Sequence, residues 1–226
     1  MEIKTNIIYR KRKTIKISIE SEDSITVISP PWVNKKRIME IVELNSEGIY
    51  NEIEKLKELG FKHKNIEERT TILYLGREYR FKITFNEKIK QRHIELTDNI
   101  FCVYTNTQEQ EKIVQTIKTW YIENGIGIII ERINYYKQYI DVSPQKIKLK
   151  EQKKRWGTCT SKGNLLFNWR IIMAPIDIID YIVVHEMCHL IHFNHSKNFW
   201  NLVESIIPDY RERKEWLKIN GLKLFF

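Results

Sequence analysis

The stretch Val-Val-His-Glu-Met-Cys-His-Leu-Ile-His-Phe-Asn-His, residues 183–195, holds four of the six histidines in a chain of 226 residues. His185 and His189 are four positions apart, so on a helix their imidazoles share one face and can bind one metal ion. Glu186 projects about 100° away from His185, beside such a metal and not onto it. The pattern His-Glu-x-x-His therefore predicts a metal-dependent hydrolase, with Zn2+ as the metal and Glu186 as the general base.

A third ligand is expected, because a catalytic zinc ion usually has three protein ligands and a water. His192 lies on the helix face of His185 but about 10.5 Å along the axis, which makes a poor tetrahedron. His195 follows Asn194, a residue typical of turns, so a helix that ends before it can bring His195 back over the metal. We favour His195 as the third ligand and expect His192 to lie beside the site or in the cleft. Cys188 is expected to pack in the core, with tuning of the site as the alternative.

Helical and strand patterns alternate along the rest of the chain. Apolar residues at helical spacing predict helices, with Gly60 after the end of the first and Ser196 as an N-cap, at about 35–59, 108–140, 174–192, 196–207 and 209–220. Gly125 and Gly127 are expected to kink or divide the second of these helices. Alternating apolar and polar residues predict strands at 14–19, 25–28, 71–85, 93–96, 100–105, 147–149 and 165–171.

These patterns divide the chain into two regions. Residues 1–105 form a β-rich N-terminal region with one helix, and residues 106–226 form an α+β region. The composition, 42% hydrophobic and 30% charged, provides enough apolar residues for a core and excludes a disordered chain. Three cysteines exclude a disulfide-stapled secreted scaffold. No apolar run reaches the roughly 18 residues of a membrane helix, and no signal peptide is evident. We therefore expect a soluble cytoplasmic protein that does not enter a membrane.

The formal net charge is +9. A basic chain attracts nucleic acid, phosphorylated small molecules or acidic surfaces, and the charge alone does not choose among them. Basic residues cluster at Arg10–Lys13, Lys146–Arg155 and Arg211–Lys214. Each cluster is either a solvated surface or part of a site that binds an anion.

Further motifs surround the histidines. They are Trp156-Gly157-Thr158-Cys159-Thr160, Asn168-Trp169-Arg170, Ala174-Pro175, Asn194-His195-Ser196 with Phe199-Trp200, and Pro208–Arg213. With them the sequence resembles the YgjP-like metallopeptidase-domain family, which is itself similar to SprT-like and WLM zinc-protease domains. Thr158 and Thr160 stand where serine is usual and keep the hydroxyl groups. The N-terminal half resembles the family more weakly, at Arg10–Lys13, Pro30-Pro31-Trp32 and Leu75–Tyr79.

The resemblance implies a zinc site made of His185, His189 and His195, with Glu186 as the general base. It also implies a fold in which a β-rich N-terminal region precedes a compact zincin-like domain, with a small antiparallel sheet packed on the His-Glu-x-x-His helix. A metallopeptidase acting on a peptide or protein substrate is the expected function, although the resemblance does not supply the substrate.

Two alternatives remain open at this point. One is a metal-dependent hydrolase of a nucleotide-like phosphoanhydride, and the other is a basic nucleic-acid-associated module with a vestigial metal site. The strand at Leu165–Ile171 is either a docking edge for a peptide or ordinary core sheet. Arg170, Tyr210 and Arg211 are weak candidates for binding the substrate or its developing oxyanion.

Overall fold

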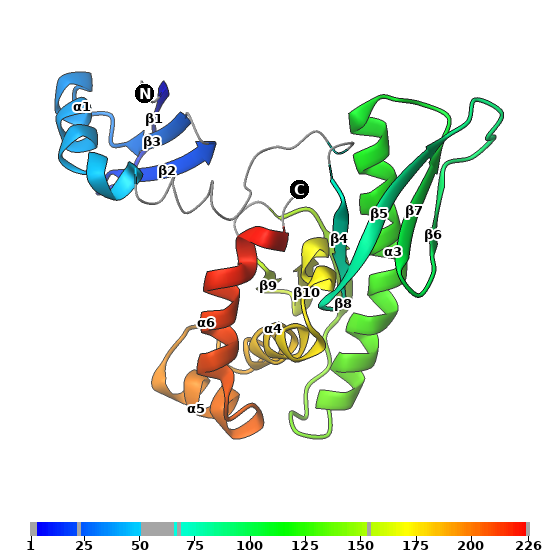
Figure 1. Cartoon of the computed structure of the whole chain (residues 1–226). Helices are drawn as coiled ribbons and strands as arrows, with labels where there is room; N and C mark the ends of the chain where they lie inside the picture. Colours follow the sequence, from blue (N-terminus) through cyan, green and yellow to red (C-terminus); the bar gives the residue numbers. More distant parts are fainter. Residues whose placement is uncertain (1–3, 22–23, 51–65, 67–68, 153–154, 225–226) are drawn as a thin grey trace. The chain divides into compact units, whose positions relative to one another are not determined.

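The computed structural model describes residues 4–21, 24–50, 66, 69–152 and 155–224. Internal contacts divide the chain into two compact units, Met1–Lys64 and Asn65–Phe225 (Figure 1). Within the second unit, the sheet formed by residues 71–105 packs against the helix that follows it.

The first unit contains a three-stranded sheet. Strand β3 (Ser24–Ser29) lies between β1 (Lys4–Tyr9), to which it is parallel, and β2 (Lys16–Ser21), to which it is antiparallel. Alternating residues of β3 enter the core, where Ile25 and Val27 are fully buried. This core is aliphatic and small.

Helix α1 (Lys35–Leu44) covers this core with the buried side chain of Ile38. It begins after Asn34, whose side-chain oxygen accepts a hydrogen bond from the N–H of Arg37 at 2.8 Å. The sequence predicted a helix to residue 59. Residues 46–50 are again helical, and residues 59 and 60 lie outside the described part of the chain.

The second unit begins with a four-stranded sheet in the order β4-β5-β7-β6. Its strands are β4 (Thr71–Tyr74), β5 (Arg77–Phe85), β6 (His93–Leu96) and β7 (Ile100–Thr105). Helix α3 (Gln110–Tyr136) packs against this sheet and is continuous, so the expectation that Gly125 and Gly127 divide it is wrong. Gly125 serves close packing instead, because a Cβ there would lie 2.5 Å from Cγ1 of Ile172.

A smaller sheet follows, in the order β8-β10-β9. Strand β10 (Asn164–Asn168) is parallel to β8 (Lys146–Lys150) and antiparallel to β9 (Gly157–Cys159). The sheet is therefore mixed and not antiparallel as expected. The chain reverses direction twice between β8 and β10, so these two strands run the same way. Because β10 lies in the middle of the sheet, β9 is an edge strand.

Helix α4 (Ile176–Cys188) is the most buried helix of the second unit and contacts α3, α5 (Lys197–Ile206), α6 (Tyr210–Asn220) and β9. The short helix η2 (Trp169–Met173) leads into it, and η3 (Gly221–Leu224) follows α6. Asp180 of α4 is 6% exposed and binds Arg132 of α3 through two hydrogen bonds of 2.5 and 2.9 Å. This bidentate pair fixes α4 against α3.

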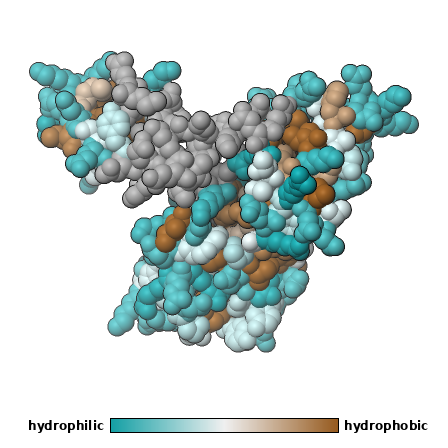
Figure 2. Space-filling view, in the orientation of Figure 1, coloured by the Kyte–Doolittle hydropathy of each residue, from teal (hydrophilic) through white to brown (hydrophobic). Residues whose placement is uncertain are grey.

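The chain thus has a mixed fold of helices and small sheets. Among the described residues, no helix is both long and apolar enough to cross a membrane. In the view of Figure 2, hydrophilic residues cover most of the visible surface of the second unit, with hydrophobic residues scattered among them. The site described next lies entirely within this unit.

Candidate metal centre

Helix α4 positions two of the clustered histidines. His185 lies in its last turn and His189 is its C-cap residue, so their rings lie one turn apart with centroids separated by 4.9 Å. The helix ends at Cys188, earlier than the predicted position near 192. Its apolar residues, among them the fully buried Ile179 and Val183, fix the helix in the core and hold His185 in place.

The chain then turns back and brings the third histidine to the same point. Residues 189–194 form a turn in which the N–H of His192 donates to the carbonyl of Cys188 at 2.9 Å. Ser196 caps α5, as its residue type predicted, by accepting a hydrogen bond from the N–H of Phe199. His195 therefore stands directly before the start of α5 and faces α4.

The three imidazoles converge as a metal site requires. One ligand atom from each of His185, His189 and His195 lies within 4.8 Å of the others, and Nε2 of His195 is 3.1 Å from Nε2 of His185. Nitrogens bound to one tetrahedral zinc ion lie about 3.3 Å apart, since each zinc–nitrogen bond is about 2.0–2.1 Å. The residues present therefore fit a zinc ion, and the all-imidazole donor set suits zinc.

Hydrogen bonding and burial prepare these rings for a metal. Nδ1 of His189 lies 2.9 Å from the carbonyl oxygen of His192, so Nδ1 donates there and Nε2 is left for the metal. His192 thus contributes its backbone rather than its imidazole. Burial, and then the charges of His189, His195 and Lys214, lower the pKa of His185 to about 3, so its ring is neutral.

Two aromatic residues of α5 enclose the imidazoles. Phe199 is fully buried and stacks on His189 with ring centroids 4.4 Å apart. Trp200 stacks on His195 at 5.5 Å and on Tyr210 at 5.3 Å. These contacts restrict the rotamers of the two histidines, so the ring positions are set before a metal binds.

Glu186 is 5% exposed and lines the same cavity as the three histidines. Burial raises the pKa of its carboxyl to about 7, although a hydrogen bond from the backbone of Cys159 and the charge of Arg155 act in the opposite direction. Among the described residues, its Oε2 atom has no hydrogen-bond partner. A buried polar atom without a partner is costly, and a catalytic role explains such an atom.

Gly157 of β9 makes room for this carboxylate. A Cβ at this position would lie 2.5 Å from both Cγ and Oε1 of Glu186, closer than real side chains approach. Because Glu186 comes from α4 and Gly157 from β9, the missing side chain lets the helix and the strand pack together around the carboxylate. The glycine of the Trp-Gly-Thr-Cys-Thr motif thus has a steric reason at the site.

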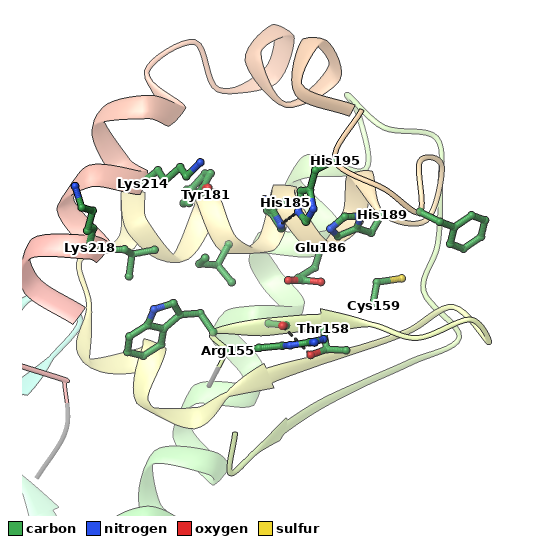
Figure 3. A pocket seen from close by; sticks show the side chains of 15 residues that line it. Arg155, Thr158, Cys159, Tyr181, His185, Glu186, His189, His195, Lys214 and Lys218 are labelled. Carbon is green, nitrogen blue, oxygen red and sulfur yellow. Dashed lines mark hydrogen bonds between the residues drawn. The ribbon is translucent and has the colours of Figure 1, made fainter. Parts of the chain in front are cut away.

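A cavity of about 660 Å3 surrounds these groups (Figure 3). Its lining comes from β9 and the residues just before it, from α4 and the turn after it, and from α6. Tyr181, one turn before His185, also lines it, and burial raises the pKa of its phenol to about 12. The phenol therefore stays protonated near neutral pH and is able to donate a hydrogen bond.

The three weak substrate-binding candidates lie elsewhere and are absent from the cavity lining. Arg170 pairs with Glu151 and lies over the ring of Trp169. Tyr210 is buried under Trp200, and Arg211 pairs with Glu204 at 2.8 Å. Cys188 is buried, and it does not belong to the group of potential metal ligands found among the described residues.

Sequence reasoning did not single out Tyr181, and it named Lys214 only within a basic cluster and Gly157 only within a motif, without placing either at the cavity. Tyr181 carried a usable signal, because it precedes His185 by four positions and so shares its helix face. Lys214 reaches the cavity through the packing of α6 on α4, and no local spacing in the sequence indicates that packing.

Three histidine nitrogens converge in a cavity that a buried carboxylate also lines, an arrangement able to hold a metal ion and to move a proton beside it. The chain belongs to the YgjP-like, metallopeptidase domain family, whose match spans residues 13–220. The resemblance predicted from the motifs is thereby confirmed. Membership of this family supports the general assignment of the chain as a metal-dependent peptidase.

A solved structure, the metallopeptidase zymogen of Pyrococcus abyssi abylysin, is also similar to part of the chain. The two share 18% sequence identity with a TM-score of 0.37, and the match covers 41% of this chain and 92% of that one. No curated protein matches the chain.

Proposed function

We propose that the chain is a zinc-dependent peptidase that hydrolyses a peptide bond at the centre formed by His185, His189 and His195. The observation that carries the proposal is the buried carboxylate of Glu186. Its Oε2 atom, without a partner among the described residues, belongs to the same cavity as the three converging imidazoles. Membership of a metallopeptidase family supports the same function.

The chain's own groups supply the proton transfers. A zinc ion bound by the three imidazoles would polarise the scissile carbonyl and acidify a water molecule. Glu186 takes a proton from the attacking water and returns it to the nitrogen of the leaving amine. The Tyr181 hydroxyl donates to the carbonyl oxygen as negative charge develops there.

The edge of the small sheet provides a place for an extended substrate. Strand β10, the candidate docking edge, is the central strand and is paired on both sides, so it serves as core sheet. Strand β9 is paired only with β10 in the described sheet, and its residues 157–159 line the cavity. We therefore assign docking of the peptide by strand addition to β9.

Cleavage of a mixed peptide library, followed by mass spectrometry, tests the proposal. The zinc-loaded protein is expected to cleave peptides, a chelator to abolish cleavage, and zinc to restore it. Glu186→Gln is expected to lower kcat about 10³-fold while the protein keeps its metal. Glu131→Gln, a change at an exposed carboxylate of α3 outside the cavity, is the matched control and is expected to retain full activity.

Two results would contradict the proposal. One is a zinc-loaded protein that cleaves no peptide but hydrolyses a nucleoside triphosphate in a Glu186-dependent manner. The other is peptide cleavage that survives in Glu186→Gln, which would place the activity at another site or in a contaminant.

A further inference from the structure

The cavity beside the candidate metal centre is strongly cationic. Three of its lining residues are basic, namely Arg155, Lys214 and Lys218, and the only acidic residue in the described lining is the buried Glu186. Lys214 and Lys218 project from α6, where they are four positions apart and share one helix face (Figure 3). A bound divalent metal would make the cavity more positive still.

Lys214 has no carboxylate within 4.0 Å among the described residues, although most cations on α6 have one. Its ammonium group lies 4.7 Å from the centroid of Trp200, the ring that stacks on His195. This contact with the Trp200 ring holds the ammonium group near His195 and leaves its positive charge unneutralised.

Lys218 extends the positive surface by one helical turn. It pairs with Glu215 at 3.0 Å, but both side chains are more than half exposed, at 76% and 55%. Such surface pairs contribute little, so an incoming carboxylate can replace Glu215 at small cost. Because both lysines line the cavity that also holds the three histidines, they are placed to contact a group of the substrate near the scissile bond.

We propose that this cavity selects peptides that carry an acidic side chain close to the scissile bond, with Lys214 and Lys218 binding its carboxylate. The inference rests on the proposed peptidase function and names the substrate class for it. A carboxylate forms charge-assisted hydrogen bonds with the two ammonium groups. A lysine at the same substrate position is repelled by them, so the site discriminates by both attraction and repulsion.

Binding to a zinc-loaded protein that carries Glu186→Gln measures this preference apart from catalysis. Fluorescence anisotropy compares labelled peptides of one neutral sequence in which each position in turn is Glu, Gln or Lys. At the selected position, the Glu peptide is expected to bind about tenfold more tightly than the Gln peptide. The Lys peptide is expected to bind more weakly than both. High salt should reduce the preference for Glu.

Variants assign the preference to the two lysines. Lys214→Gln combined with Lys218→Gln is expected to lose most of the preference for the Glu peptide, with Arg155 then the one cationic side chain left in the described lining. Lys214→Arg should keep the preference for the Glu peptide, because it retains the positive charge. This variant therefore distinguishes loss of charge from a folding defect caused by substitution at this position. Lys223→Gln, an exposed change of the same kind outside the cavity, is the matched control and should also keep it.

Equal binding of Glu and Gln peptides at every position would overturn the inference, and so would a preference that is undiminished in the double variant. The wild-type protein separates this failure from failure of the proposed function. If it cleaves the neutral peptide and shows no preference, the function stands and the inference falls. If it cleaves none of the peptides, both fall.

Discussion

The two compact units of this chain are built on similar small sheets but differ in what their cores contain. In the first unit the third strand lies between the other two, β3 between β1 and β2, and the second unit repeats this order with β10 between β8 and β9. The first core is closed with the aliphatic residues Ile25, Val27, Ile38 and Ile49. In the second unit, a buried carboxyl group and three imidazoles line a cavity together with residues of β9 and α6.

The difference shows how a site is made from an ordinary packing arrangement. In β9, Gly157 has no side chain, and the carboxyl group of Glu186 occupies the room that a side chain would need. Burying this carboxyl group costs stability, whereas the described hydrophobic core cluster of the first unit contains no ionisable side chain. The comparison predicts that changes in the first unit affect stability alone and that changes around β9 and α4 affect catalysis.

The largest expected effect is on stability and contrasts one core residue from each unit. Ile38→Ala in the first unit should cost about 3 kcal/mol, because a fully buried isoleucine leaves a cavity when truncated. Ile179→Ala in α4 should cost a similar amount, and it should also weaken zinc binding. Urea unfolding and zinc titration measure both. Loss of zinc binding or of kcat in Ile38→Ala would contradict the proposal that the first unit affects stability alone.

Gly157→Ala tests whether the missing side chain at this position leaves the room that the Glu186 carboxyl group needs. The new methyl group must displace the carboxylate, and a displacement of about 1 Å from the reacting atoms lowers kcat about 100-fold. Zinc content and KM should stay unchanged. Gly127→Ala is the matched control, because nothing lies within 4 Å of a Cβ there. Adding Glu186→Asp to Gly157→Ala should recover part of kcat, since the shorter side chain relieves the clash. Full activity in Gly157→Ala would contradict the steric argument.

Stability of the metal-free protein should report the buried carboxyl directly. Burial raises the pKa of Glu186 from an ordinary 4.5 to about 7, so the folded state holds this proton more tightly than the unfolded state. The stability it contributes is present below pH 4.5 and is lost as pH rises through 7. Glu186→Gln should therefore be more stable than wild type at pH 8 by about 2 kcal/mol, with a smaller difference at pH 5. Denaturant unfolding with chelator measures this, and a difference that does not change with pH would argue against burial as the cause.

The smallest expected effect concerns Tyr181. Tyr181→Phe should lower kcat about tenfold and leave KM unchanged, because one neutral hydrogen bond to the developing oxyanion is lost. Tyr139→Phe, at an exposed tyrosine outside the cavity, is the control. A rise in KM without a change in kcat would instead make Tyr181 a residue that binds the ground state of the substrate.

Sequence patterns predicted the local parts of this molecule well. The spacing of His185 and His189 sets their shared helix face, and Asn194 and Ser196 indicated the turn that returns His195, which the structure brings to the same point. These features depend on a few neighbouring residues, for which helix geometry and capping rules are sufficient.

Features that depend on distant packing were not predictable in the same way. The pairing of β10 with β8 in parallel, the close approach of Gly125 to Ile172 and the entry of Lys214 into the cavity all join segments far apart in the chain. Periodicity says which face of an element is buried and not against what it is buried. For this reason the edge strand of the small sheet was assigned from the sheet order and not from the sequence.

The metal content of purified variants tests the central claim most directly. His192 contributes its carbonyl oxygen and His195 its imidazole, so two histidines three positions apart should behave oppositely. Elemental analysis should find a single zinc ion per chain in the native protein and in His192→Ala, and a loss of zinc in His195→Ala. A native protein without metal, or zinc retained in His195→Ala and lost in His192→Ala, would contradict the assignment of the site.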